Sequence, residues 1–322
     1  MAKTCALLVC LGLSLGCARR SPPAPRLWVS DHAGRDVIAV DPRAAQVLDR
    51  IDVGAEPRGL ALVSEQQQLY VAVADGVAVV DLRRRTVRKL RVDGKPAALA
   101  VSRVDGTLWV ATDGAGELVA VDAVTGAPRG RVAVGAKPAG VAVRPDGKLV
   151  FVAVAGADQV VAVDAHSFAV AARIPVAAGP RAIVLGDDGR TAYVMSERGR
   201  AVTVFDAATL QPLGDIAVTQ DSAAPAGVHP SGGALSADGH ALYVSCGRGA
   251  SVAILDVVAR RQLRSIDGAG QAPLGLALDR DGRHLYSANG SGHNLSIIDV
   301  VSGNVDRRIA VGGEPWDVVV AP

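Results

Sequence analysis

Eight side chains that could bind or transform a ligand occur at two fixed positions of a segment that recurs along the chain. In most copies the segment reads Gly-x-x-Pro, and the two positions lie directly before and directly after its proline. Both positions vary between charged, polar, aromatic and small residues, whereas nearby positions stay Val, Ile, Leu or Ala. Because variable loop positions at one end of a repeat array select the ligand, we expect a ligand-binding face there. The candidates are Glu56, Arg58, Lys95, Lys137, Arg181, His229, Glu314 and Trp316.

These residue types include those that hydrolysis of a lactone requires, namely a general base and a cation close to the reacting carbonyl group. Nothing in their spacing shows that they converge, so the sequence predicts no particular catalytic residue. Residues 27–322 contain no Gly-rich phosphate loop and no Gly-x-Ser-x-Gly nucleophile motif.

A second set of side chains is of the types that can bind a metal ion. His32, His229, His293 and Cys246 are all expected near the same face, and whether they come close together is left open. They belong to different repeats and lack the close spacing of a metal-binding motif. No Cys-x-x-Cys-His motif is present, so covalent c-type haem is excluded. We therefore predict no metal and no cofactor.

The elements that must position these residues are repeats with a period of about 42 residues, which is typical of a four-stranded propeller blade. Seven apolar segments each end in an aspartate that can cap a turn: Asp41, Asp81, Asp122, Asp164, Asp206, Asp256 and Asp299. Seven of the ten aromatic residues occupy one further column, where they are expected to pack between blades: Trp28, Tyr70, Trp109, Phe151, Tyr193, Tyr243 and Tyr286. Trp316 alone among the aromatic residues falls on the ligand face.

The strands at which the repeat region begins and ends predict how the ring closes. The repeat region enters at the second strand of a blade and leaves after an innermost strand, so three N-terminal strands and one C-terminal strand complete one blade. The sequence thus predicts an all-β, seven-bladed β-propeller with four-stranded antiparallel blades over residues 27–322. One insertion, 219–226, falls on the ligand face, where it is expected to be a lid or rim, or else tolerated surface variation.

The repeats resemble the YVTN family of β-propeller proteins. The segments LYVAVADGVAVVD and GAKPAGVAVRPDGKLVFVAVAGADQVVAVD follow that family's strand and Gly-x-x-Pro pattern, although the final Asn of the YVTN strand is kept only as Asn289. The resemblance implies the propeller fold. It leaves function open, because the family contains binding proteins, relatives of lactone hydrolases and haem-carrying enzyme domains.

The N-terminus predicts export. Residues 1–16 have a basic start and a short apolar stretch typical of a signal peptide. Ser14-Leu15-Gly16-Cys17 resembles a bacterial lipobox, which implies cleavage before Cys17 and lipidation of its thiol. Residues 17–26 form a Pro-rich tether. We expect a lipoprotein of the bacterial cell envelope, anchored in the outer membrane and facing the periplasm.

Composition argues against a nucleic-acid partner. The formal net charge is only +2. The basic run at Arg83-Arg84-Arg85 lies on an outermost strand, where charge prevents edge-to-edge association. We expect a monomeric binding scaffold that recognises a protein, glycan or small molecule at the central-channel face. The alternatives are a lactonase-like hydrolase and a metal- or haem-dependent redox component.

Overall fold

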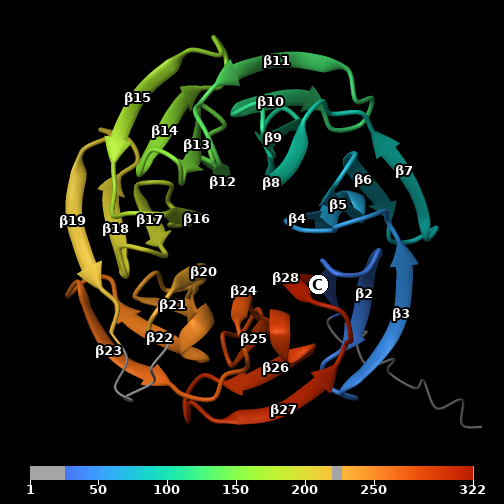
Figure 1. The fold of residues 1–322 in the computed structure, drawn as a ribbon, viewed down its shortest axis with the longest axis vertical. Coiled ribbons are helices and arrows are strands. Elements are labelled where there is room, and N and C mark those ends of the chain that lie inside the picture. Colours follow the sequence, from blue (N-terminus) through green and yellow to red (C-terminus); the bar gives the residue numbers. More distant parts are fainter. Residues whose placement is uncertain (1–25, 220–226, 322) are drawn as a thin grey trace, which may run out of the picture.

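A computed structural model describes residues 26–219 and 227–321 of the chain. The predicted fold is confirmed: within these residues, strands β1 to β28 form seven four-stranded antiparallel sheets, which stand as blades around a central axis (Figure 1). Three single-turn 3-10 helices connect strands: η1 (Ser64–Gln66), η2 (Gly247–Gly249) and η3 (Gly290–Gly292). None of the helices in the described part of the chain is long and apolar enough to cross a membrane.

The blades follow one another in sequence. Blade 1 contains β28 (Pro315–Ala321), β1 (Arg26–Asp31), β2 (Asp36–Asp41) and β3 (Gln46–Asp52), from the axis outward. Blades 2 and 3 contain β4 (Leu60–Val63), β5 (Gln68–Val73), β6 (Gly76–Asp81) and β7 (Thr86–Leu90), then β8 (Lys95–Val101), β9 (Thr107–Asp113), β10 (Glu117–Asp122) and β11 (Pro128–Ala133). Blades 4 and 5 contain β12 (Pro138–Val143), β13 (Leu149–Val154), β14 (Gln159–Asp164) and β15 (Val170–Pro175), then β16 (Pro180–Leu185), β17 (Thr191–Ser196), β18 (Ala201–Asp206) and β19 (Pro212–Ala217). Blades 6 and 7 contain β20 (Pro230–Leu235), β21 (Ala241–Cys246), β22 (Ser251–Asp256) and β23 (Arg261–Ile266), then β24 (Pro273–Leu278), β25 (His284–Asn289), β26 (Asn294–Asp299) and β27 (Val305–Ala310).

Ring closure occurs where it was predicted. Strand β28 pairs antiparallel with β1, so that Leu27 lies opposite Val320 and Val29 opposite Val318. The C-terminal strand therefore completes the blade that the three N-terminal strands begin, and the labels in Figure 1 place β28 beside the blade of β2 and β3.

The hydrophobic core consists of seven clusters, and each cluster lies between two neighbouring blades. The aromatic column supplies one large buried side chain to each interface, as predicted. Phe151 of blade 4, for example, packs edge-on against Phe205 of blade 5, with ring centroids 5.3 Å apart. No blade has a core of its own, so the ring is stable only as a whole.

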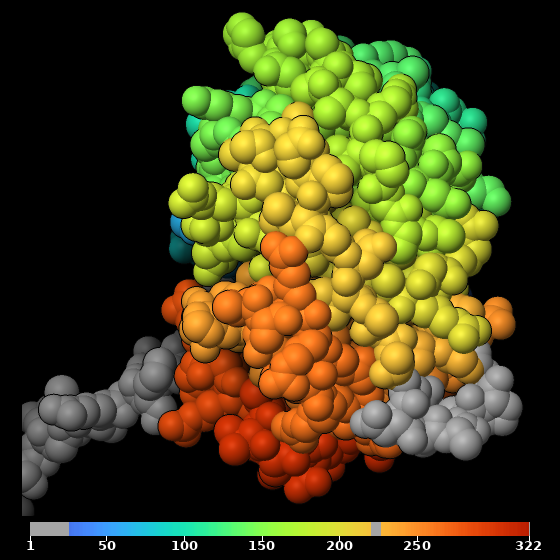
Figure 2. Space-filling view, turned by 90° about the vertical axis from the view of Figure 1, so that its left-hand side faces the viewer, coloured from blue at the N-terminus to red at the C-terminus, as the bar shows by residue number. Residues whose placement is uncertain are grey.

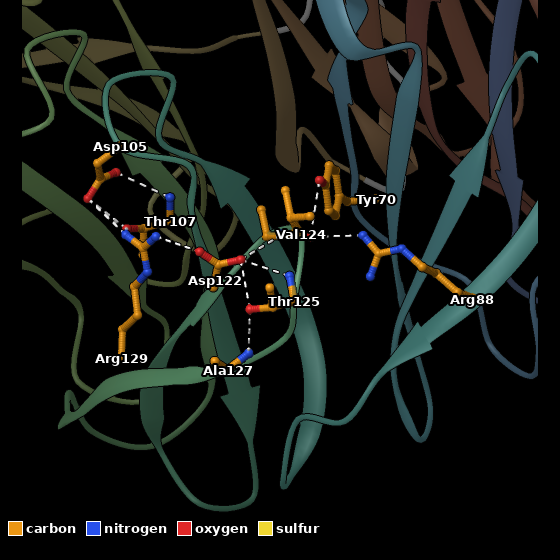
Figure 3. Close-up of polar contacts among 10 residues, drawn as sticks. Tyr70, Arg88, Asp105, Thr107, Asp122, Val124, Thr125, Ala127 and Arg129 are labelled. Atoms are coloured by element: carbon orange, nitrogen blue, oxygen red, sulfur yellow. Dashed lines mark hydrogen bonds and ion pairs between the residues drawn. The ribbon is translucent and has the colours of Figure 1, made fainter.

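The repeated aspartates are turn caps, as predicted. Each accepts hydrogen bonds from backbone N–H groups two or three residues later. Figure 3 shows one of them, Asp122, which accepts the backbone N–H of Thr125 at 2.7 Å and also pairs with Arg129. Seven similar turns are thus fixed without any of these carboxylates facing a ligand.

Arginines of the outer strands also join neighbouring blades. Arg88 of β7 donates to the carbonyl oxygen of Ala123 in blade 3 at 3.0 Å, and the Tyr70 hydroxyl reaches the same oxygen (Figure 3). Arg173 bonds Val134 O, and Arg264 bonds Val300 O, in the same way. Figure 2, which faces blades 4 to 6, shows their outer edges packed side by side. The basic outer strands therefore have a structural use beyond the predicted protection of edges.

Removing one interface aromatic tests the shared core. We expect Phe151→Ala to lower the free energy of unfolding by about 3–5 kcal/mol, because a fully buried ring is lost from an interface that cannot collapse. Phe168→Ala is the matched control; that ring also contacts an aromatic side chain, Trp109, but is only half-buried, so a smaller loss is expected. Urea unfolding followed by circular dichroism measures both, and equal losses would contradict this account of the interface.

Candidate functional site

A cavity of about 420 Å³ lies on the propeller axis. It is lined by residues of the innermost strands, or of the segments just before them, from all seven blades. Its charged and aromatic lining residues are Arg58, Asp113, Lys137, Arg181, Trp316 and Asp317. Every residue that directly follows a repeat proline lines it: Arg58, Ala97, Ala139, Arg181, Ser231, Leu274 and Trp316.

An irregularity in the strand pairing explains why the residue after each proline faces the cavity. In six blades the register between the innermost strand and its neighbour shifts directly after the proline. Between Pro180 and Ala182, for example, the shift leaves Arg181 without a partner across the strands. A bulge of this kind re-aims the side chain of the unpaired residue. The repeat thereby presents seven different side chains to one cavity.

The three predicted residues that follow a proline all line the cavity, whereas of the five that precede one only Lys137 does. Arg58, Lys137, Arg181 and Trp316 line the cavity. The other four, Glu56, Lys95, His229 and Glu314, lie directly before their prolines and are not part of its lining. Residues 220–226, nearly all of the predicted lid, lie outside the described residues, and Thr219 before them donates its N–H to the Gln262 side chain.

Glu56 belongs to an ion-pair cluster between blades 2 and 3. Its carboxylate contacts the Lys95 ammonium and lies 3.6 Å from Nη2 of Arg58. The hydrogen bond from Lys95 lowers the pKa of Glu56 further than desolvation raises it. A carboxylate paired in this way is a weak base, which makes Glu56 a poor candidate for proton abstraction.

A second cluster lies across the ring, between blades 5 and 6. The Glu197 carboxylate lies 3.6 Å from Nε of Arg181 and 3.4 Å from Nδ1 of His229. The contact with His229 is close enough for an ion pair but lacks hydrogen-bond geometry, because Nδ1 of His229 has no hydrogen-bond partner in the protein. Glu197 therefore holds Arg181 in place at the cavity wall.

Trp316 connects the two clusters across the cavity. The guanidinium carbon of Arg58 lies 5.7 Å from the indole centroid, and that of Arg181 lies 5.9 Å from it. His32 packs against the same indole with ring centroids 4.8 Å apart. Burial lowers the pKa of His32, and the nearby Arg58 charge lowers it further. The imidazole is consequently neutral at pH 7.

Two nitrogen atoms beside Trp316 are buried without a hydrogen-bond partner in the protein. They are Nδ1 of His32 and Nε of Arg58, two of six such side-chain atoms among the described residues. An unpaired buried polar atom costs about 1–3 kcal/mol, so such an arrangement calls for an explanation.

Asp317 is one of two acidic residues of this cavity that the sequence analysis did not indicate; the other is Asp113. The Asp317 carboxylate accepts the backbone N–H of Leu60 and that of Val318, each at 2.9 Å. Desolvation by burial nevertheless raises its pKa to about 6. The signal was available, because the second position after the proline is Gly or Ala in the other six repeats.

The residues at that position are small because neighbouring innermost strands come into contact there. A Cβ atom on Gly232 would lie 2.3 Å from Leu274 O, and one on Gly275 would lie 2.6 Å from Asp317 Oδ1. A carboxylate at this position is therefore unusual within the repeat, and it marks blade 1 as different from the others.

A third informative column directly follows the second strand of each blade. It holds His32, Asp113 and Glu197, and elsewhere Ala or Gly. Asp113 lines the cavity, Glu197 pairs with Arg181, and His32 stacks on Trp316. Only His32 was considered from sequence, and then as a metal ligand.

The four possible metal ligands do not form a site. Cys246 is buried in the core, where desolvation raises the pKa of its thiol to about 11. His229 pairs with Glu197, whereas His293 contacts Gly313 O. In the residues that the structure describes, no group of three or more His, Cys, Asp or Glu side chains could hold a metal ion.

Comparison with known proteins gives one family match and several structural matches. A family model described as lactonase, 7-bladed beta-propeller, matches residues 41–319. No curated protein matches the chain.

Three solved structures show the same fold. Hydrazine synthase of Kuenenia stuttgartiensis has a TM-score of 0.75 at 22% identity, over 86% of this chain and 92% of that chain. A periplasmic gluconolactonase of Pseudomonas aeruginosa has a TM-score of 0.75 at 20% identity, over 92% of this chain and 99% of the other. A functionally unknown protein of Desulfotomaculum acetoxidans has a TM-score of 0.78 at 13% identity, with the same two coverages.

The raised pKa of Asp317 predicts a pH dependence of stability. Between about pH 4 and about pH 6 the folded protein keeps a proton on Asp317 that the unfolded chain has lost. The free energy of unfolding of the wild type should therefore fall, relative to that of Asp317→Asn, as the pH rises through this range. Since one pH unit corresponds to about 1.4 kcal/mol, the relative fall should approach about 3 kcal/mol.

Urea unfolding on either side of that pH range measures the difference. Asp306→Asn, which removes an exposed carboxylate from β27, is the control and should leave the pH dependence unchanged. Parallel curves for the wild type and Asp317→Asn would show that Asp317 ionises normally.

Proposed function

Because the chain belongs to the lactonase family of seven-bladed β-propellers, we propose that it hydrolyses a lactone in the cavity on the propeller axis. This assigns the protein to the hydrolase alternative rather than to the non-catalytic binding scaffold. The observation that carries the proposal is the Asp317 carboxylate in a cavity wall that also contains Arg58, Lys137 and Arg181.

The cavity suits an oxygen-rich ring compound. Three cationic side chains can attract an acidic substituent and stabilise the negative charge that develops on a carbonyl oxygen. The Trp316 indole offers an apolar surface beside them. A sugar-acid lactone combines both features, and gluconolactone is the first substrate to examine.

Asp317 is the base that this environment favours. Its carboxylate is desolvated and has no cationic partner among its hydrogen bonds, whereas Glu56 and Glu197 are each held between two basic side chains. Its pKa of about 6 leaves it ionised at neutral pH, yet basic enough to accept a proton from water.

The reaction then follows simply. Asp317 takes a proton from a water molecule as the water oxygen attacks the lactone carbonyl carbon, and Arg58 or Arg181 stabilises the resulting oxyanion. When the ring C–O bond breaks, Asp317 returns the proton to the departing alkoxide. The product is the open-chain hydroxy acid.

Turnover of gluconolactone tests the proposal. We expect Asp317→Asn to lower kcat/KM by about a hundredfold or more, because it removes the general base. In the wild type kcat/KM should rise with pH to a plateau above about pH 6, as the carboxylate ionises. Acid release followed with a pH indicator, corrected for spontaneous hydrolysis, measures both.

Asp306→Asn serves as the control, since it removes a carboxylate from the outer strand β27 and leaves the cavity intact. If a panel of lactones and esters gives no turnover above background, the hydrolase proposal fails and the binding scaffold becomes the better interpretation. If Asp317→Asn retains full activity, the base has been assigned wrongly.

We also propose that the enzyme acts in the cell envelope as a lipid-anchored monomer. Cys17 and the rest of the tether up to residue 25 lie outside the described residues, so this proposal rests on the lipobox-like sequence and the YVTN resemblance. The likeness to a periplasmic gluconolactonase agrees with an exported site of action. The described propeller begins at Arg26, which was predicted to be the last residue of the tether but is the first residue of β1.

Lipidation can be tested by a single substitution. In a bacterial host, the wild type should incorporate labelled palmitate and sediment with membranes, whereas Cys17→Ser should do neither, because the acylated thiol is missing. Cys246→Ser is the matched control, since its thiol is buried and unreactive. Equal labelling of the wild type and Cys17→Ser would contradict a lipid anchor at Cys17.

A further inference from the structure

Two nitrogen atoms that could bind an anion lie unpaired against Trp316. Nδ1 of His32 and Nε of Arg58 are buried without a hydrogen-bond partner in the protein. The indole packs against both side chains, at 4.8 Å from the His32 ring and 5.7 Å from the Arg58 guanidinium carbon. Both nitrogen atoms therefore belong to side chains that contact one indole, and Arg58 and Trp316 line the cavity.

The charge of Arg58 is only loosely compensated. Its nearest acid, Glu56, lies 3.6 Å from Nη2, and that carboxylate is shared with Lys95. The side chain of Arg58 is nonetheless only 22% exposed. A guanidinium that is mostly desolvated and weakly paired attracts a second anion strongly, and it can offer Nε–H and an Nη–H together.

Hydrogen bonds fix the backbone around Trp316, whereas its side chain is held by ring packing against His32 and by cation–π contacts with Arg58 and Arg181. His32 N donates to Glu314 O at 2.9 Å, and Asp317 N donates to the Ser30 hydroxyl at 3.1 Å. The indole borders an open cavity of about 420 Å³. A rotation of the Trp316 side chain can thus uncover the two nitrogen atoms without opening the ring.

We propose that Trp316 is a movable cover over an oxyanion subsite formed by Nδ1 of His32 and Nε of Arg58. The ligand group is a carboxylate, such as the one that lactone opening creates, and its oxygens displace the indole and pair with both nitrogen atoms. The neutral imidazole donates from Nδ1 in the corresponding tautomer. The choice of a carboxylate rests on the proposed function; the subsite itself rests on the unpaired atoms.

This arrangement makes an unusual prediction for Trp316. If the indole were a platform for the ligand, Trp316→Ala would weaken binding. If it is a cover, the ligand must displace it at a cost, and Trp316→Ala removes that cost. Binding of D-gluconate, measured by isothermal titration calorimetry, should then tighten by about threefold or more.

The two anion-binding nitrogen atoms can be removed separately. His32→Phe keeps a ring against Trp316 but lacks the ring nitrogen atoms. Arg58→Lys keeps the positive charge but lacks the several N–H donors of the guanidinium group. Each should weaken gluconate binding by about tenfold, which is the loss of one charge-assisted hydrogen bond. Lys148→Gln, which removes a positive charge at an exposed turn of blade 4, is the control and should bind as the wild type does.

Fluorescence reports the movement of the cover directly. Trp28 and Trp109 are 3% and 1% exposed, so quenching by acrylamide reports mainly on Trp316. Saturating gluconate should raise the quenching constant of the wild type, and Trp316→Phe should abolish this change. The Phe variant also covers the case in which the Ala variant fails to fold.

Each other outcome overturns the proposal. It fails if neither gluconate nor acetate binds at millimolar concentration, if Trp316→Ala or, where that variant does not fold, Trp316→Phe weakens binding, or if His32→Phe binds as the wild type does. The proposed function is judged separately: the expected binding pattern without turnover of any lactone would keep the subsite and overturn the hydrolase assignment.

Discussion

The pairing of β28 with β1 is the interaction on which the rest of the structure depends. Each of the seven core clusters lies between two blades, so separating any two blades exposes apolar surface on both. Strands β28 and β1 are far apart in the sequence, so no short loop joins them. Their hydrogen-bonded pairing must therefore hold blade 1 together. The Asp31 carboxylate supports that pairing: it accepts the Glu314 N–H at 2.8 Å and fills the space next to Gly313, where a Cβ atom would overlap it.

Closure also explains why the two most distinctive cavity residues come from one strand. In six blades the register shift after the repeat proline turns one side chain toward the axis. In blade 1 that side chain is Trp316, and the next residue is Asp317, which bonds Leu60 N of blade 2. The strand that closes the ring therefore holds both neighbours and carries the proposed base. Trp316 and Asp317 thus belong both to the strand that closes the ring and to the proposed site. The raised pKa of Asp317 indicates that burial destabilises its ionised form.

The fold was predictable because its determinants repeat. The aspartate caps, the aromatic column and the phase of the termini each have a fixed period, so seven weak signals support one another. The site was less predictable because it depends on departures from the repeat. The position after the proline identified Arg58, Arg181 and Trp316, all of which line the cavity. The position before it was less informative, since a bulge directs only the residue that follows. Asp317 stood out in its column, but the sequence could not show that a carboxylate would fit where Gly and Ala are packed.

The place of β28 in the chain has a consequence for biogenesis. Among the propeller strands it is the last to leave the ribosome and, if the protein is exported, the last to cross the membrane. Until it arrives, blade 1 lacks its innermost strand, and the cavity lacks both its indole and its carboxylate. A partly synthesised or truncated chain that lacks β28 therefore has neither a closed ring nor a complete cavity wall. Completion of the ring and assembly of the proposed site therefore become a single event, so only molecules that contain β28 have the complete site.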